Sequence, residues 1–231
     1  MNHLAKIWNK HAGAVALAAL AASAPLAVPA AVAQPPERAS ASAHSGSTQP
    51  GSAQLSQVAT ALRAIRTMQA DFLQTDRNGQ SVRGIMTLKQ PGRIRFEYEK
   101  SVPMLVVGDG SSLTVVDYGV RQVQRWPIKD SPLGALLDPS RDVSRYGTLR
   151  PTGNRDVVSV EVRDKAHPEY GVITLIFIRK PSAPGGFELV RWVALDSQNK
   201  QTMIQLSNQR YGLAVPDSTF RWRDPRPRIR R

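Results

Sequence analysis

At positions 88–99 the chain reads Leu88-Lys89-Gln90-Pro91-Gly92-Arg93-Ile94-Arg95-Phe96-Glu97-Tyr98-Glu99. After the Pro-Gly turn, charged and apolar residues alternate without a break. The arginines and glutamates therefore fall on one face, and Ile94, Phe96 and Tyr98 fall on the other. Alternation with a period of two is typical of a strand with one solvated and one apolar face. A sheet of such strands must bury its apolar face, against protein or against a ligand.

The N-terminal region predicts export. Lys6 and Lys10 precede an apolar run over residues 14–28, and Ala31-Val32-Ala33 supplies a small-residue cleavage site. We therefore predict a signal peptide over residues 1–33 and a periplasmic mature protein, with an uncleaved anchoring helix as the alternative. Residues 34–52 are rich in Ala, Ser, Pro, Gln and Gly and predict a disordered leader. The folded domain is expected over residues 53–222.

The composition limits the remaining possibilities. The chain has no cysteine, so packing must replace disulfides and no lipid-attachment cysteine is available. The net charge is +13, and arginines concentrate in the C-terminal region, with residues 223–231 expected to form a basic tail. Export argues against nucleic acid as the partner. Anionic phospholipids or an acidic protein face are the expected counterparts, and a solvated, frayed terminus is the alternative.

Periodicity along the chain predicts helices and antiparallel strands. Leu55, Val58, Ala59, Leu62 and Ile65 recur at helical spacing and predict one helix over about residues 52–68. Strands are then expected over 69–75, 82–89, 93–98, 103–107, 113–116 and 120–126, joined by short Gly- and Asp-containing turns such as Asp76-Arg77-Asn78-Gly79.

The second half predicts a short apolar helix and more strands. Ser131 is the expected N-cap, Pro132 the first helical residue, and Asp138-Pro139 the end of that helix. Further strands are expected over 157–162, 172–179, 187–195 and 201–209, of which residues 172–178 are nearly all apolar, as in a strand covered on both faces. The predicted fold class is α+β, mainly β: a curved antiparallel sheet with helices against one face.

The sequence gives no sign of catalysis. Three of the four histidines, His3, His11 and His44, lie in the signal and leader, which leaves His167 in an expected surface loop. One histidine without cysteine does not supply the usual zinc ligands or a Ser-His-acid triad. Gly108-Asp109-Gly110 reads as a hairpin turn, because no third glycine and no βαβ pattern follow. We therefore expect no enzyme activity, no metal and no cofactor.

These features together resemble a known family, the periplasmic lipoprotein carrier LolA. The likeness begins at Gln69-Ala70-Asp71-Phe72-Leu73-Gln74, is strongest over residues 83–98, and continues through Gly108-Asp109-Gly110 to Ser131-Pro132. It covers about half of the chain and weakens after Pro151. The resemblance implies a half-open barrel with a helical lid and an apolar cavity that shields lipoprotein acyl chains.

The resemblance also implies partners. A carrier of this family takes acylated lipoproteins from an ATP-driven release complex in the inner membrane and passes them to an outer-membrane acceptor lipoprotein. We expect a monomer. By alternation and resemblance, the expected lipid-binding residues are Met86, Leu88, Ile94, Phe96, Tyr98, Met104, Val106, Leu113 and Val115 on strands, and Leu133, Leu136 and Leu137 in the lid. Ordinary core is the alternative for any one of them.

One position departs from the family pattern. The residue before the motif proline is commonly basic in the family, and here it is Gln90, while Lys89 is kept. Handover of cargo is therefore assigned to Lys89 and Arg93.

Three other functions remain open at this point. An outer-membrane acceptor shares the fold but is normally a lipoprotein, which the absent cysteine disfavours. A lipid-binding envelope sensor or regulatory module would use the fold to bind a protein partner, although such proteins usually carry an additional domain. A periplasmic enzyme is disfavoured by the lack of convergent titratable groups.

Overall fold

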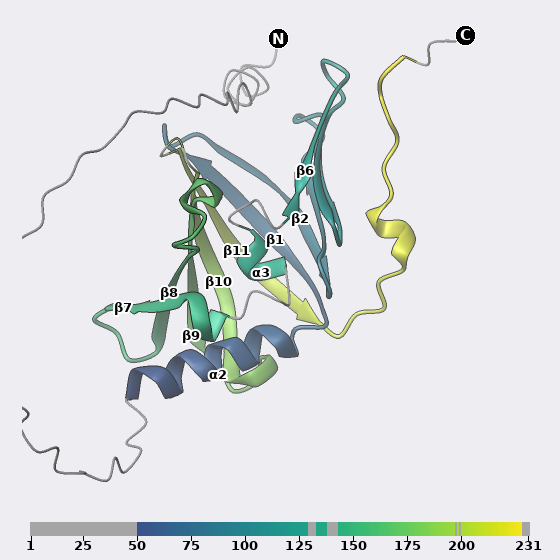
Figure 1. The fold of residues 1–231 in the computed structure, drawn as a ribbon. Coiled ribbons are helices and arrows are strands. Elements are labelled where there is room, and N and C mark those ends of the chain that lie inside the picture. The colour runs from purple at the N-terminus through teal and green to yellow at the C-terminus, as the bar shows by residue number, and fades with distance from the viewer. Residues whose placement is uncertain (1–49, 129–132, 138–142, 197, 199, 228–231) are drawn as a thin grey trace, which may run out of the picture.

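In the computed structural model, the described residues are 50–128, 133–137, 143–196, 198 and 200–227 (Figure 1). These ranges do not include the expected signal peptide or nearly all of the expected leader. They also do not include the two ends predicted for the short helix, Ser131-Pro132 and Asp138-Pro139. The helices are α2 (Pro50–Ala64), α3 (Gly134–Leu137) and α4 (Val143–Tyr146). Short 3-10 turns are η2 (Pro168–Tyr170), η3 (Pro184–Gly186) and η4 (Asp217–Phe220).

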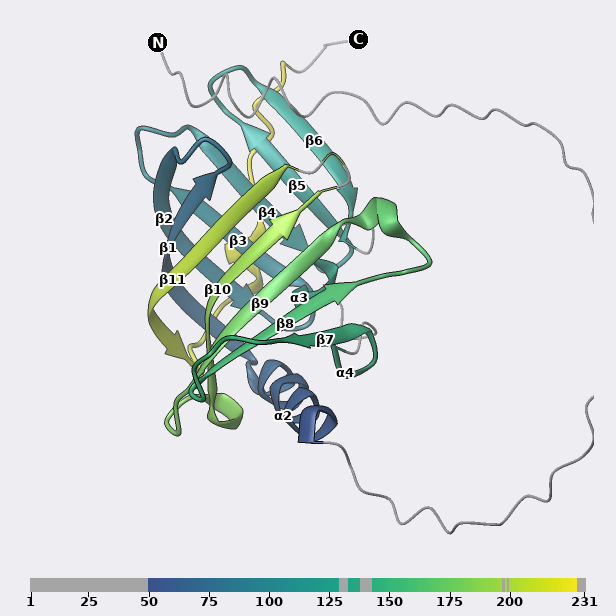
Figure 2. The same cartoon turned by 90° about the vertical axis from the view of Figure 1, so that its left-hand side faces the viewer.

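The described strands form one antiparallel eleven-stranded sheet with the order β6-β5-β4-β3-β2-β1-β11-β10-β9-β8-β7. Their bounds are β1 (Thr67–Asp76), β2 (Ser81–Lys89), β3 (Arg93–Tyr98), β4 (Met104–Asp109), β5 (Ser112–Asp117), β6 (Gln122–Pro127), β7 (Gly147–Arg150), β8 (Val157–Arg163), β9 (Val172–Arg179), β10 (Phe187–Leu195) and β11 (Gln201–Tyr211). The sheet curves strongly, and its edge strands β6 and β7 do not pair, so it is a half-open barrel (Figures 1 and 2). The predicted fold class is confirmed.

Alternation in the sequence becomes the two faces of this sheet. In β3, Ile94, Phe96 and Tyr98 are buried on the inner, concave face, while the intervening charged residues lie on the outer face. Helices α2 and α3 cover the inner face, where Val58, Leu62 and Leu137 join one hydrophobic cluster with the strands (Figure 1). The core therefore lies between the sheet and the helices.

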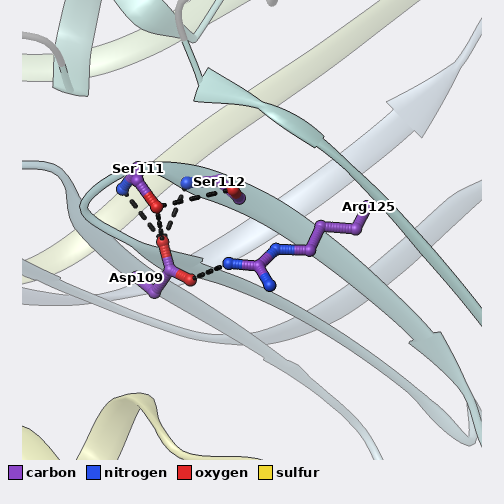
Figure 3. Close-up of polar contacts among 4 residues, drawn as sticks. All are labelled: Asp109, Ser111, Ser112 and Arg125. Carbon is purple, nitrogen blue, oxygen red and sulfur yellow. Dashed lines mark hydrogen bonds and ion pairs between the residues drawn. The ribbon is translucent and has the colours of Figure 1, made fainter.

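The hairpin turns follow from local chemistry. Asp76 Oδ1 accepts hydrogen bonds from the amides of Asn78 and Gln80, which fixes the β1–β2 turn. Asp109 Oδ1 accepts hydrogen bonds from the Ser111 and Ser112 amides, and Asp109 Oδ2 accepts one of 2.6 Å from Arg125 (Figure 3). Partial burial acts to raise the pKa of Asp109, but the Ser112 and Ser111 hydrogen bonds and the Arg125 charge outweigh it and lower that pKa.

Two glycines are required by close approach. A Cβ at Gly92, whose φ is +70°, would lie 2.7 Å from the Cα of Gly110, so the β2–β3 and β4–β5 turns pack directly together. A Cβ at Gly84 would lie 2.1 Å from the carbonyl oxygen of Glu97 and 2.6 Å from the Phe72 ring. Gly84 thus leaves the space on the inner face that Phe72 fills.

The structure corrects two sequence predictions and adds two elements. Helix α2 ends at Ala64 and not near residue 68, because Thr67 onward pairs with β2, and β1 places Met68 in the core. Strand β9 is buried on one face only, since its alternate residues are half-exposed. Helix α4 and strand β7, of four residues each, were not predicted because they are too short for periodicity to show.

Candidate functional site

The expected lipid-binding residues converge on the inner face. Eleven of them are buried in one hydrophobic cluster, and the twelfth, Leu133, is half-buried against it. The strand members are Met86, Leu88, Ile94, Phe96, Tyr98, Met104, Val106, Leu113 and Val115, and the helix members are Leu136 and Leu137. For the strand members, alternation correctly predicts the face on which each side chain lies. Their role in lipid binding stays a prediction.

Aromatic rings form the centre of this cluster. Phe72 packs edge-on against Phe96 and against Tyr98, with ring centroids 5.3 Å and 5.2 Å apart. Phe96 also meets Trp192 at 6.1 Å. The sequence reasoning did not assign Phe72 and Trp192 to the site. Phe72 could have been found, because Met68, Ala70 and Phe72 occupy every second position of β1. These edge-on contacts favour a defined ring arrangement.

The same face holds a polar pair. Tyr98 Oη donates a hydrogen bond of 2.8 Å to Gln74 Oε1, and both side chains are buried. Burial raises the pKa of the Tyr98 hydroxyl well above its ordinary value, so Tyr98 stays a neutral donor. Tyr98 was predicted to line the site, but its partner Gln74 was not.

Gln90 joins the sheet to the short helix α3. Gln90 Nε2 donates a hydrogen bond of 3.2 Å to the carbonyl oxygen of Leu136, while Gln90 Oε1 accepts one of 3.3 Å from the Gly92 amide. The Gln90 side chain therefore contacts the helix that covers the inner face. In this arrangement the apolar residues are closed off from solvent.

The residues assigned to handover lie on the other face. Lys89 Nζ donates a hydrogen bond of 2.7 Å to Asp217 Oδ1, and Arg93 pairs with the same carboxylate. The hydrogen bond from Arg93, followed by that from Lys89, lowers the pKa of Asp217 from 3.8 to about 2. Both basic residues are therefore held by the C-terminal segment, which was not foreseen.

That segment, residues 213–222, crosses the outer face of β3, β4 and β5 and is termed the C-terminal strap (Figure 1). Phe220 is buried against Leu105, Val107 and Val116, which form a second, separate hydrophobic cluster. Arg95 donates hydrogen bonds of 3.3 Å to the carbonyl oxygens of Thr219 and Arg221. The outer face of β3 was expected to be solvated, but the strap covers part of it.

A hollow of about 660 Å³ opens on the outer face of the sheet, over β1, β2, β3 and β11. Five of its lining residues are charged, namely Asp71, Arg83, Glu97, Glu99 and Lys100. Phe72, Gly84 and Tyr98 also contribute to its wall. This charged outer hollow is distinct from the expected apolar chamber.

The described residues contain no group of three or more His, Cys, Asp or Glu side chains placed to hold a metal ion. None of the helices in those same ranges is both long and apolar enough to cross a membrane. His167 lies exposed beside η2, with its Nδ1 3.0 Å from Glu169 Oε1 and its ring stacked on Tyr170.

Known proteins share this sequence pattern. The family described as "Outer membrane lipoprotein carrier protein LolA" matches residues 63–223. The outer-membrane lipoprotein carrier protein of Dechloromonas aromatica is 30% identical over 175 residues, which cover 71% of this chain and 80% of that protein. The corresponding protein of Chromobacterium violaceum is 30% identical over 171 residues, covering 70% of this chain and 79% of that protein.

Among solved structures, a LolA superfamily protein from Nitrosomonas europaea has a TM-score of 0.43 and 11% identity, covering 74% of this chain and 97% of that one. The sequence matches extend from the end of α2 through all the strands to the strap. This chain therefore belongs to the LolA family of outer membrane lipoprotein carrier proteins.

Proposed function

We propose that this protein is a periplasmic, non-enzymatic carrier that shields lipoprotein acyl chains between its sheet and its helices. It would take acylated lipoproteins from an ATP-driven release complex in the inner membrane and deliver them toward the outer membrane. The proposal rests on the continuous apolar inner face, to which strands β1–β5 and helix α3 all contribute buried side chains. Family membership and the carrier names of the relatives support the same role.

The energetics require such a surface. Exposing one CH₂ group to water costs about 0.8 kcal/mol, so an unshielded acyl chain costs on the order of 10 kcal/mol. In the closed form, the apolar residues cover one another. Met68, Met86 and Met104 contribute flexible side chains to that face and can repack around a chain of variable shape. A carrier needs this adaptability because it must also release its cargo.

Helix α3 is the lid in this proposal. It has only four residues, and its Leu136 and Leu137 occupy the inner face where acyl chains would lie. The hydrogen bond from Gln90 to Leu136 holds it against the β2–β3 turn. Loading would displace α3. The incoming acyl chain would then take the place of Leu136 and Leu137 against the inner face.

The partners follow from the surface. Lys89 and Arg93 would engage acidic groups of a membrane complex or acceptor lipoprotein when they leave Asp217. The arginine-rich end beyond the strap, including Arg223 and Arg226, would favour anionic phospholipid surfaces. An envelope sensor with the same fold remains the second candidate, and the test below separates the two.

Photo-crosslinking tests the carrier function with an inner and an outer position. Phe96 and Glu97 are neighbours in β3 with opposite orientation, one buried and one exposed. With p-benzoylphenylalanine at position 96, we expect crosslinking to the acyl chains of a triacylated lipopeptide after irradiation. With the same residue at position 97, we expect none.

Organic extraction of the periplasmic protein provides the independent measurement. Co-purified acylated cargo supports the carrier. Equal crosslinking from both positions, or an empty protein that binds a regulatory protein and no lipopeptide, would overturn the carrier function and support the sensor.

A further inference from the structure

The polar pair of Gln74 and Tyr98 has an unused donor. Gln74 is 8% exposed and Tyr98 is 9% exposed, and their hydrogen bond spans 24 residues of sequence. A glutamine amide offers two N–H donors besides its oxygen. Of the two polar atoms of the Gln74 side chain, Oε1 accepts the hydrogen bond from Tyr98. Nε2 donates no hydrogen bond to any described residue. An amide donor is thus available at the edge of a largely apolar surface.

The other buried polar side chains do not share this property. Thr87 and Thr114 pair with outer-face residues of their neighbouring strands, and so point away from the inner face. Asp117 accepts hydrogen bonds from the amides of Gly119 and Val120, and Glu188 is bound by Lys180. Among the described residues, the fully buried side-chain oxygen or nitrogen without a hydrogen-bond partner is Tyr211 Oη, which lies opposite Met68 at the other end of β1. At the β1–β2 end of the inner face, Gln74 is the buried polar side chain with a donor that makes no hydrogen bond.

The pair also lies at one end of the apolar face. Gln74 is opposite Val82 and Ile204, near the β1–β2 turn, whereas Met68 at the start of β1 is opposite Leu88, near the β2–β3 turn and the lid. The ring of Phe72 packs against Tyr98, and the ring of Phe96 packs against Phe72. A ligand along this face would meet the amide at one end and apolar side chains along the rest.

We propose that the Gln74 amide, positioned by Tyr98, binds the carbonyl oxygen that joins an acyl chain to its carrier molecule. This inference rests on the proposed carrier function, because it assigns a polar group of the cargo to the same face. Every protein-linked acyl chain ends in an ester or amide carbonyl, which is a hydrogen-bond acceptor without charge. The Gln74 amide nitrogen keeps some contact with solvent, since it is not among the fully buried unpaired atoms. A cargo carbonyl would replace water as its hydrogen-bond acceptor. The pair would then set how deeply the chain inserts.

The test compares two probes of equal length, methyl hexadecanoate and hexadecyl methyl ether, in displacement of a fluorescent apolar dye from the full mature protein. The ester carries the carbonyl and the ether lacks it. One neutral hydrogen bond corresponds to a preference of about five- to ten-fold for the ester. Gln74→Met, which keeps the length and removes the donors, should abolish that preference while leaving ether affinity within about two-fold.

Tyr98→Phe is the matched control. It breaks the pair but leaves the Gln74 amide in place, so an ester preference of more than about two-fold should remain. If Gln74→Met weakens ester and ether binding to the same extent, so that the ester preference remains, the pair is only structural and the subsite is overturned. If the wild-type protein binds both probes equally well, the subsite is overturned but the carrier function is not. This result needs no variant to fold. A wild-type protein that binds neither probe overturns the carrier function as well.

Discussion

Asp217 Oδ1 accepts a hydrogen bond of 2.7 Å from Lys89 Nζ and also pairs with Arg93. One carboxylate of the C-terminal strap therefore joins the last residue of β2 to the first residue of β3. The turn between those strands carries Gln90, which contacts the lid on the opposite face. The strap and the lid thus meet at the two sides of one hairpin.

Replacing Asp217 tests what holds the strap. Asp217→Asn removes the charge that both basic residues share, so we expect the strap to open more often. Hydrogen exchange should become several-fold faster at residues 213–222 and stay unchanged in β9 and β10. Asp224→Asn is the control, because Asp224 pairs with Arg226 of its own segment. Unchanged exchange in Asp217→Asn would show that apolar contacts alone hold the strap.

The same carboxylate predicts a pH dependence. The pKa of Asp217 is about 2 in the folded protein, below its ordinary value of 3.8, so the unfolded chain takes up the proton first. The stabilisation is complete above about pH 5 and is lost as pH falls from about 4 toward 2. The difference in thermal midpoint between the wild type and Asp217→Asn should therefore shrink over that range. A constant difference would contradict this ion pairing.

Phe220 provides the apolar anchor of the strap. Its ring is buried against Leu105, Val107 and Val116 on the outer face. Phe220→Ala should lower the free energy of unfolding by about 3 kcal/mol in denaturant titration, because it leaves a cavity in that cluster. Ser218→Ala, at an exposed neighbouring position, should change it by less than about 0.5 kcal/mol. Similar small effects from both would show that the outer cluster contributes little.

Truncation separates the strap from the basic tail. A chain that ends at Trp222 keeps the outer cluster, so its thermal midpoint should match the full chain. Its binding to vesicles of anionic phospholipid should weaken, and the loss should be largest at low salt. A chain that ends at Gly212 should lose stability as well. A large loss of stability in the Trp222 truncation would show that residues 223–231 belong to the fold.

Gln90 tests the lid. Gln90→Leu removes the hydrogen bond to Leu136 and should make α3 easier to displace. We expect a stability loss of about 1 kcal/mol and faster uptake of a fluorescent triacylated lipopeptide in stopped-flow mixing. Gln80→Leu, in the exposed β1–β2 turn, is the control and should leave uptake unchanged. Slower uptake in Gln90→Leu would mean that Gln90 assists loading and does not retain the lid.

Much of the candidate site could be predicted from one local rule. The alternation in β3 places Phe96 inside and Glu97 outside, and the same rule orients Met104, Val106, Leu113 and Val115 correctly. The alternation rule failed where an element is too short to show a pattern, and where pairing with a distant strand sets the boundary of an element. Strand β7 has four residues, and α2 ends early because β1 pairs with two strands.

The sequence by itself determined which side chains share a face, because the period of a strand is a property of its own backbone. Only the tertiary structure decided what covers each face and which polar groups meet there. Asp217 reaches Lys89 across 128 residues, and Tyr98 reaches Gln74 across 24. Such contacts depend on the path of the whole chain, since the pairing of β11 with β1 brings the strap that follows β11 to the outer face of β3.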